Sequence, residues 1–382
     1  MKQRTPLTHH SFRPHVRILI IIFVAYLING CAQPPTSPDY PLPLITASDE
    51  QLLANGQPFE VRGVNYVRSS GVDQNICWTL QFGADARCPW DLPAITADFD
   101  KLRALGVNTI RVFLNFYVFG GSVPVISDTG KSIALLHLED LIREANQRGI
   151  YVIPVLLIEY PQDQFASIHY ERAFDVHVRP IVRNFAGNNG ILAWDLFNEP
   201  DIGSPVDIRC WDWDNADHPG CFPLAEERQQ FIAALSAEVA TLDPGRLRTT
   251  GLAFAKSHFE PIEAAARIAD MVDFFTFHYY DDGPYHSGRY KAHWYYGKGF
   301  PDDLRRSIEE IQALGLKRPI VVTELGFPTV PLDPEASRDT AMLNRDLRAA
   351  RDLLREVGAG GMVLWSFQDS FTTLLDDLYP PR

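Results

Sequence analysis

The sequence is poor in cysteine, in basic residues relative to acidic ones, and in long apolar runs. Five of its 382 residues are cysteine, and 35 Lys and Arg stand against 48 Asp and Glu, which gives a net charge of -13. This charge argues against a nucleic-acid partner, because such partners require a basic surface. The cysteines form no CxxC pair and have no histidine pair nearby at ligand spacing. We therefore predict no metal and no cofactor.

The one long apolar run stands near the start of the chain, from Ile18 to Ile28. It is too short to span a bilayer comfortably, and the segment before it is basic and has no acidic residue. Residues 1–30 are therefore predicted to be an export signal outside the fold. Ile28-Asn29-Gly30-Cys31 resembles the bacterial lipoprotein processing site, in which the cysteine is lipidated and becomes the new N-terminus. The alternative is an ordinary secretory peptide with a chance cysteine.

Residues 31–45 are predicted to form an extended tether, because five prolines exclude a helix there. If Cys31 is lipidated, the tether holds the body of the protein away from a membrane, and Ala32 resembles signals that sort lipoproteins to the outer membrane. We expect an exported protein, lipid-anchored to the cell envelope on its periplasmic or surface face. Residues 46–382 are predicted to form one domain.

The other four cysteines form two pairs of equal spacing, Cys77 with Cys88 and Cys210 with Cys221. An even number of cysteines in an exported chain suggests disulfides. We predict these two bridges, each of which would staple a loop. Zinc binding by the cysteines is the alternative.

Apolar strand-like runs alternate with amphipathic helical segments from Phe59 onward, a pattern typical of repeated βα units and a parallel sheet. Eight runs qualify as strands, the number that closes a (β/α)8 TIM barrel. They span residues 61–67, 108–115, 151–158, 191–198, 247–253, 272–279, 320–324 and 362–367. After the last strand, Thr372 to Leu378 offers at most a short helix. Either another segment covers that side of the barrel or the residues before Phe59 do.

Long loops follow the first, fourth and sixth predicted strands, at residues 68–93, 201–223 and 281–301. Loops at this end of the strands build the rim of a barrel's active site. Five of the seven tryptophans lie in them, namely Trp78, Trp90, Trp211, Trp213 and Trp294. Tryptophan rings suit the apolar faces of sugars. The alternative is that they pack the loops into small cores beside the disulfides.

Two glutamates end predicted strands: Glu199 follows strand four in Asn198-Glu199-Pro200, and Glu324 ends strand seven in Thr323-Glu324-Leu325-Gly326. Active sites of parallel barrels lie where the strands end. A pair of carboxyl groups there, one protonated and one ionised, is the minimum equipment for hydrolysing a glycosidic bond.

Together with His278-Tyr279-Tyr280 after strand six and Trp365-Ser366-Phe367 after strand eight, these motifs resemble glycoside hydrolase family 5, the cellulase and β-mannanase family. The resemblance covers the chain from about Phe59. It implies a retaining β-glycosidase that hydrolyses β-linked glucan or mannan through a covalent glycosyl-enzyme. It also implies that Glu199 is the general acid/base and Glu324 the nucleophile.

The resemblance assigns roles to five neighbours of the two glutamates. Arg111 would lower the pKa of the nucleophile, and Tyr280 would bond it. Asn198 would bond the sugar 2-hydroxyl, His278 would contact the acid/base or the substrate, and Trp365 would lie under the sugar at the cleavage position. The alternative for Arg111 is a salt bridge at the bottom of the barrel. For the aromatic residues and the histidine it is a place in the packed core.

Strand three departs from the family pattern. Many members carry a histidine near its end, whereas this sequence has Glu159 and Tyr160, which are candidates to bind sugar. The departure leaves both glutamates intact and the substrate open.

Two other interpretations use the same residues. One is a surface lipoprotein that binds glycans without cleaving them, and the other is a transglycosylase in which a sugar replaces water. The complete set of Arg111, Asn198, Glu199, Tyr280 and Glu324 favours catalysis, because binding alone would not require it. The expected partners are a β-linked carbohydrate and, only through the lipid anchor, a membrane.

Overall fold

The computed structural model describes residues 42–68, 74–121, 130–201, 222–258, 267–281, 298–327, 338–366 and 378–379. The predicted export signal, Cys31, most of the tether, Cys210 with Cys221, and nearly all of the predicted last helix lie outside these ranges. Three of the loop tryptophans, Trp211, Trp213 and Trp294, lie outside them as well. Within the described ranges, every helix is too short or too polar to cross a membrane.

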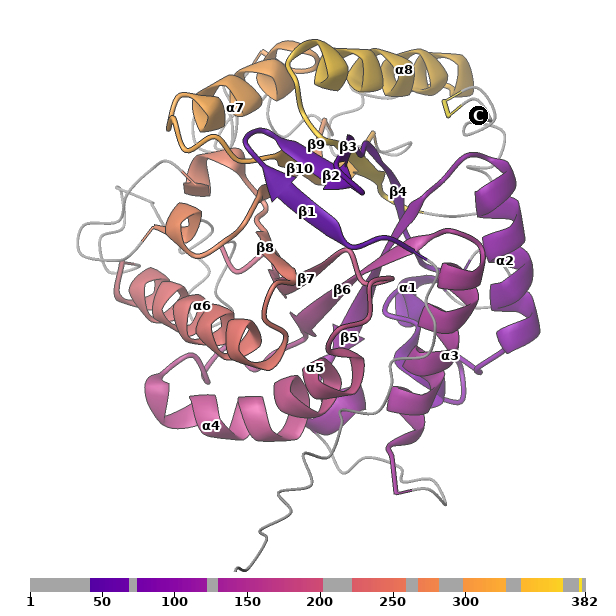
Figure 1. Ribbon diagram of the computed structural model, residues 1–382, viewed down its shortest axis with the longest axis vertical. Helices are drawn as coiled ribbons and strands as arrows, with labels where there is room; N and C mark the ends of the chain where they lie inside the picture. The colour runs from indigo at the N-terminus through magenta and orange to yellow at the C-terminus, as the bar shows by residue number, and fades with distance from the viewer. Residues whose placement is uncertain are drawn as a thin grey trace, which may run out of the picture. The chain divides into compact units, whose positions relative to one another are not determined.

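Eight parallel strands form a barrel, in the order β8-β7-β6-β5-β4-β11-β10-β9 (Figure 1). The two ends of this sheet meet through a bridge between Leu252 and Phe277, beside which the backbone N–H of His278 donates to the carbonyl of Leu252 at 2.7 Å. The predicted (β/α)8 barrel is confirmed. The strands are β4 Val61–Asn65, β5 Thr109–Asn115, β6 Tyr151–Ile158, β7 Ala193–Asn198, β8 Leu247–Gly251, β9 Phe275–Tyr280, β10 Ile320–Gly326 and β11 Gly361–Leu364.

Helices surround the barrel, and local sequence signals mark where they begin and end (Figure 1). The side chain of Asp91 accepts a hydrogen bond from the N–H of Ala94 at the start of α2, as expected for a helix cap. Gly106 follows the end of α2 and has a φ of 77°, a conformation that glycine adopts without strain. The helices are α1 Gln74–Cys77, α2 Leu92–Ala104, α3 Ile133–Gln147, α4 Tyr170–Ala173, α5 Arg179–Phe185, α6 Phe222–Leu242, α7 Asp302–Gln312 and α8 Thr340–Glu356. Shorter helical turns are η1 Gln81–Gly83, η2 Tyr117–Gly121, η3 Ser167–His169, η4 Phe174–Val178, η6 Ala255–His258 and η7 Ile268–Asp270.

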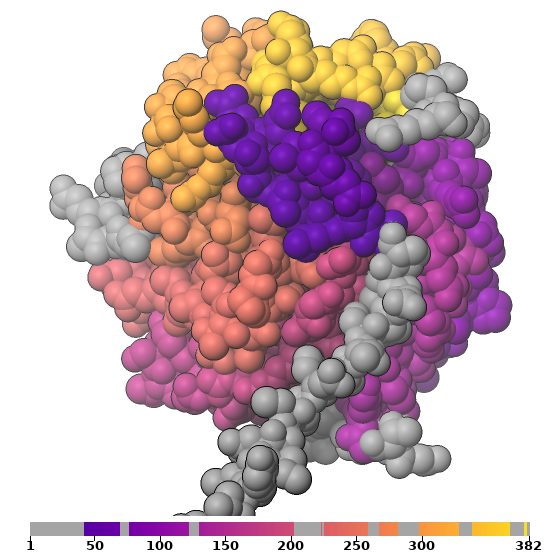
Figure 2. Space-filling view, viewed as in Figure 1, coloured from indigo at the N-terminus to yellow at the C-terminus, as the bar shows by residue number. Residues whose placement is uncertain are grey.

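A small antiparallel sheet closes the end of the barrel at which its strands begin. It consists of β1 Ile45–Ser48, β2 Gln51–Ala54 and β3 Gln57–Pro58, drawn in indigo across the barrel in Figures 1 and 2. Ile45 and Leu52 of this sheet pack against barrel residues such as Ile153, Leu192 and Val321 in one apolar cluster. The residues before Phe59 therefore cover this end of the barrel.

The end of the chain covers part of the barrel's side. Leu378 and Tyr379 are buried, and Arg351 of α8 donates to the carbonyl of Leu378 at 2.7 Å. A Cβ atom on Gly106, just after α2, would lie 2.6 Å from the carbonyl oxygen of Tyr379. Leu378 and Tyr379 thus lie against α8, against the residue pair that follows α2, and beside Arg62 of β4.

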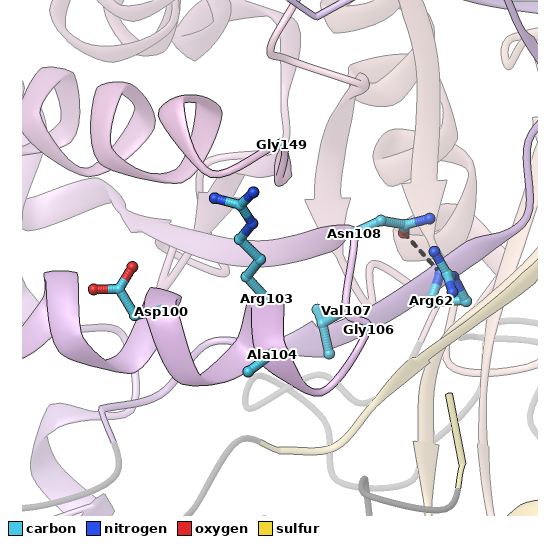
Figure 3. Close-up of a pocket in the computed structure, with 8 residues that line it drawn as sticks. All are labelled: Arg62, Asp100, Arg103, Ala104, Gly106, Val107, Asn108 and Gly149. Atoms are coloured by element: carbon cyan, nitrogen blue, oxygen red, sulfur yellow. Dashed lines mark hydrogen bonds between the residues drawn. The ribbon is translucent and has the colours of Figure 1, made fainter. Parts of the chain in front are cut away.

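A polar hollow of about 480 Å³ opens where the strands begin (Figure 3). Among the residues that line it are Arg62, Arg103 and Asn108. Glu199 and Glu324 lie at the opposite ends of their strands. This hollow is therefore separate from the place where the two glutamates lie.

Candidate active site

The carboxyl groups of Glu199 and Glu324 meet where the barrel strands end. Glu199 directly follows β7, and Glu324 lies within β10. Nδ1 of His278, in β9, is 2.7 Å from Oε1 of Glu199 and 3.6 Å from Oε2 of Glu324. One oxygen of each carboxyl group lies within 4.8 Å of the other. Retaining glycosidases hold the two groups about 5 to 5.5 Å apart and inverting ones about 6.5 to 9.5 Å apart. The spacing suits retention.

Arg111 of β5 is fully buried beside this pair and donates four hydrogen bonds. Its Nη1 donates to Oε1 of Glu324 at 2.6 Å and to Oδ1 of Asn65 at 3.0 Å. Its Nη2 donates to Oδ1 of Asn198 at 2.8 Å, and its Nε to Oδ2 of Asp195 at 2.9 Å. The single guanidinium of Arg111 thus pairs with two buried carboxylates, those of Asp195 and Glu324. The structure places it beside Glu324 and not at the bottom of the barrel.

Both carboxylate oxygens of Glu324 accept a hydrogen bond. Arg111 donates to Oε1, and the hydroxyl of Tyr280 donates to Oε2. Burial raises the pKa of Glu324 above its ordinary value, while Arg111 and Tyr280 act in the opposite direction because they stabilise the charged form. Burial also raises the pKa of Tyr280 well above its usual range, so its hydroxyl remains a donor. This set of partners fits an ionised carboxylate.

Glu199 has a different environment, although it lies close by. Its carboxyl group bonds His278, and burial lowers the pKa of that imidazole to about 4, so the ring is neutral at neutral pH. Burial raises the pKa of Glu199 to about 7, with Arg111 opposing the shift. The side chain keeps 24% of its surface exposed. Glu199 can therefore hold a proton near neutral pH and reach a substrate.

An aromatic cluster stands near the two carboxyl groups. The half-buried ring of Trp365 lies 5.8 Å from that of Phe113 and 6.4 Å from that of Trp78, measured between centroids. The backbone N–H of Trp365 donates to the carbonyl of Leu325, the residue after Glu324. Cys77 forms the predicted disulfide with Cys88 and so fixes the loop that carries Trp78. Trp365 is thus held beside the strand segment that carries Glu324, and Trp78 lies next to Trp365.

Residues 52–368 match the family described as Cellulase (glycosyl hydrolase family 5). The match covers most of the chain and includes all the motifs named above. The chain belongs to glycosyl hydrolase family 5. The prediction made from those motifs is confirmed at the level of the family.

Several relatives of this family 5 chain carry names of mannan-degrading enzymes. A protein named probable mannan endo-1,4-beta-mannosidase F, from Emericella nidulans, is 24% identical over 263 residues, which are 59% of this chain and 55% of the relative. Mannan endo-1,4-beta-mannosidase A from Hypocrea jecorina is 22% identical over 354 residues, which are 81% of this chain and 72% of the relative. The chain spans about half the length of the Emericella relatives that it matches.

Solved structures share the barrel fold of this family 5 chain. The β-1,4-D-mannanase from Cryptopygus antarcticus is 18% identical with a TM-score of 0.58, over 88% of this chain and 94% of that one. An exo-β-1,4-mannosidase from Opitutaceae bacterium strain TAV5 is 19% identical with a TM-score of 0.57, over 87% of this chain and 57% of that one. At these identities the likeness concerns the fold.

Motifs at the strand ends do not identify three residues of this family 5 site. Asn65 and Asp195 accept hydrogen bonds from Arg111 inside the barrel. Gly251, at the end of β8, leaves space for the same group, because a Cβ atom there would lie 2.6 Å from Nη2 of Arg111 and 3.0 Å from Nε2 of His278. Polar residues or glycine within apolar runs were the only available signal.

Two sequence-based interpretations of the barrel rim need correction. Tyr160 is 3% exposed, and its ring packs 5.4 Å from Phe165 and 5.1 Å from Phe231, so it belongs to the core and does not bind sugar. Trp90 stacks on His137 at 4.5 Å and so packs its loop, as the alternative interpretation proposed. Glu159 is exposed at the end of β6.

Glu199, His278 and Glu324 also have the atom types and the spacing to hold a metal ion. The guanidinium of Arg111 lies 2.6 Å from Oε1 of Glu324 and places a positive charge there. That charge disfavours a second cation. The arrangement therefore favours a hydrogen-bonded pair of carboxyl groups over a metal site.

Proposed function

We propose that this protein is a retaining β-glycosidase that hydrolyses β-linked mannan through a covalent glycosyl-enzyme. The main support for the proposal is the pair formed by Glu199 and Glu324. One carboxyl oxygen of each lies within 4.8 Å of the other, and the two groups have different hydrogen-bond partners. Retention requires that one carboxylate reach the anomeric carbon directly. The names of the relatives favour mannan over glucan.

In the first step, an oxygen of Glu324 bonds to the anomeric carbon while the glycosidic C–O bond breaks. The leaving oxygen takes its proton from Glu199. In the second step, Glu199 removes a proton from water, whose oxygen displaces Glu324 from the carbon. Because Oδ1 of Asn198 already accepts from Arg111, the amide NH2 of Asn198 is the group that would donate to a sugar hydroxyl. Trp365 offers its ring face to the sugar.

The Glu199→Ala variant tests the acid/base role. We expect kcat/KM on a phenyl β-mannoside to fall about 10²- to 10⁴-fold, because that leaving group needs protonation. With a dinitrophenyl β-mannoside, kcat/KM should change little. With the dinitrophenyl substrate, kcat and KM should fall together. The glycosyl-enzyme forms normally but accumulates, because the variant lacks the base that activates water. Equal losses of kcat/KM on both substrates would contradict the role.

The pH dependence of kcat/KM follows from the raised pKa of Glu199. The acid must be protonated, so activity should be present below a pH of about 7 and fall about tenfold per pH unit above it. Initial rates from about pH 5 to about pH 9 measure this limb. A Glu199→Gln variant serves as the control, because its residual activity should lack the alkaline limb. An alkaline limb that persists in this variant would assign the titration to another group.

A panel of β-mannans, β-glucans and aryl glycosides tests the substrate. We expect release of soluble sugars from mannan, and hydrolysis of glucan alone would reject the proposed substrate. The relatives include proteins named for endo and for exo action, so product length decides between the two. Adding an acceptor sugar shows whether water or a sugar completes the reaction. The non-catalytic alternative predicts no products at all.

A further inference from the structure

Asp201 lies two residues after Glu199 and is a buried carboxylate that the reaction does not use. Its side chain is 0% exposed. Oδ1 accepts from the backbone N–H of Ala253 at 2.8 Å, and Oδ2 accepts from the N–H of Phe254 at 3.1 Å and from Oγ of Ser257 at 2.7 Å. All three donors belong to the segment 251–257, which ends β8 and continues into η6.

The same segment also holds Glu199 directly. The backbone N–H of Glu199 donates to the carbonyl oxygen of Gly251 at 2.7 Å. The turn Glu199-Pro200-Asp201 is therefore attached to segment 251–257 at its first residue and at its last. The backbone N–H of His278 also donates to the carbonyl of Leu252 at 2.7 Å, so the segment is itself held by β9.

Arg228 of α6 holds the turn from a second side. Its Nη1 donates to the carbonyl of Pro200 at 3.3 Å, and its Nη2 donates to Oε1 of Gln162, in the loop after β6, at 2.9 Å. The guanidinium also lies 5.3 Å from the ring centroid of Phe165. Segment 251–257 and Arg228 of α6 therefore both hold the turn, and Arg228 is itself bonded to the loop after β6.

The backbone of Glu199 explains why such a grip is needed. Its φ is 49°, in the left-handed region, which residues other than glycine rarely adopt. A residue keeps such a conformation only where its surroundings impose it. Without attachments on both sides, Glu199 would relax to an ordinary conformation and its carboxyl group would leave the vicinity of His278.

We propose that Asp201 is a positioning residue for proton transfer: it binds segment 251–257 and so holds the strained Glu199-Pro200 turn with the Glu199 carboxyl group aimed at the glycosidic oxygen. Asp201 touches neither Arg111 nor Glu324 among its hydrogen-bond partners. Its loss should therefore impair the acid and base steps and spare nucleophilic attack. The inference rests on the proposed function.

The Asp201→Asn variant tests this role. Asn has the same shape, but its NH2 group faces at least one backbone N–H that then lacks an acceptor. We expect kcat/KM on a phenyl β-mannoside to fall about 100-fold, because a displacement of a catalytic group by about 1 Å costs a factor of about that size. On a dinitrophenyl β-mannoside, kcat/KM should stay within about twofold. Ser257→Ala, which removes one donor, should cause a smaller change of the same kind and carries the test if Asp201→Asn does not fold.

Asp243→Asn is the matched control. Asp243 is also buried, and it accepts from the N–H of Gly187 and from Nε1 of Trp194, each at 3.0 Å, where β7 begins. This variant should be less stable than the wild type, and its kcat/KM should change by the same factor on both substrates. If Asp201→Asn also changes kcat/KM by the same factor on both substrates, the positioning role is overturned. If wild type and Glu199→Ala show no dependence on the leaving group, the proposed function itself fails, which is a separate result.

Discussion

The Glu324→Gln variant should fold normally and lose at least about 10⁴-fold in kcat, the scale of loss when a hydrolase loses its nucleophile. Gln has nearly the same shape as Glu, and its amide oxygen can still accept from Arg111. It is uncharged, however, and cannot form a glycosyl ester that water then cleaves. The loss should extend to dinitrophenyl β-mannosides, because a good leaving group does not replace the nucleophile. Steady-state rates on that substrate measure the effect.

The control for this variant is Glu171→Gln, at a carboxyl group that is 77% exposed and pairs with Arg179 on the surface. We expect wild-type rates from it, since exposed ion pairs contribute little to stability. Thermal unfolding and sugar binding should be retained in Glu324→Gln, which separates lost chemistry from lost structure. If the variant kept more than about a hundredth of the wild-type rate on the activated substrate, Glu324 would not be the nucleophile.

The alternation of apolar runs and amphipathic segments was sufficient to predict the barrel, because that pattern depends only on local sequence. The predicted runs 151–158 and 191–198 correspond to β6 and β7 almost residue for residue. The position of the two glutamates followed for a related reason: both stand where strands end, which is the end of a barrel at which active sites lie, and their catalytic roles stay a prediction. The disulfide between Cys77 and Cys88 followed from spacing.

The hydrogen-bond partners inside the barrel could not be predicted in the same way, because they depend on register between strands. Asn65 and Arg111 are direct partners in the β4–β5 pairing, and Asn198 stands beside Gly251 in the β7–β8 pairing. A sequence does not show these alignments. Tyr160 was misassigned for the same reason, since its burial depends on Phe231 from α6, 71 positions later in the numbering. The lipidation of Cys31 and the bridge between Cys210 and Cys221 stay predictions.

Replacing Arg111 with Met should cost both stability and activity. Met matches the length of the arginine stem but provides none of the four hydrogen bonds, so Asp195 and Glu324 would remain buried without their cation. Breaking a buried ion pair by removing one partner costs about 3 to 5 kcal/mol. Urea unfolding measures this loss. We expect a fall of kcat/KM of at least about 10²-fold on every substrate, because Arg111 bonds the carboxyl group of Glu324, the proposed nucleophile, and not that of Glu199.

The pH dependence of the stability loss distinguishes this explanation from simple loss of packing. Without Arg111, the pKa of Glu324, already raised by burial, rises further in the folded state. A carboxyl group whose folded pKa lies above its unfolded value destabilises the fold where the unfolded chain is ionised, and this cost disappears as the pH falls below the unfolded pKa. The stability deficit of Arg111→Met should therefore shrink as the pH is lowered from about 8 to about 5.

Arg246→Met provides the comparison, because Arg246 is also buried and pairs with Asp243 where the barrel strands begin. Arg246 donates in addition to the carbonyl of Ile191 at 2.8 Å, so its replacement should also lower stability. The surviving enzyme should keep wild-type kcat/KM, because no catalytic carboxyl group loses its partner. A deficit in Arg111→Met that stays constant with pH, or a kcat/KM as high as in Arg246→Met, would show that Arg111 supports the fold without controlling the charge of Glu324.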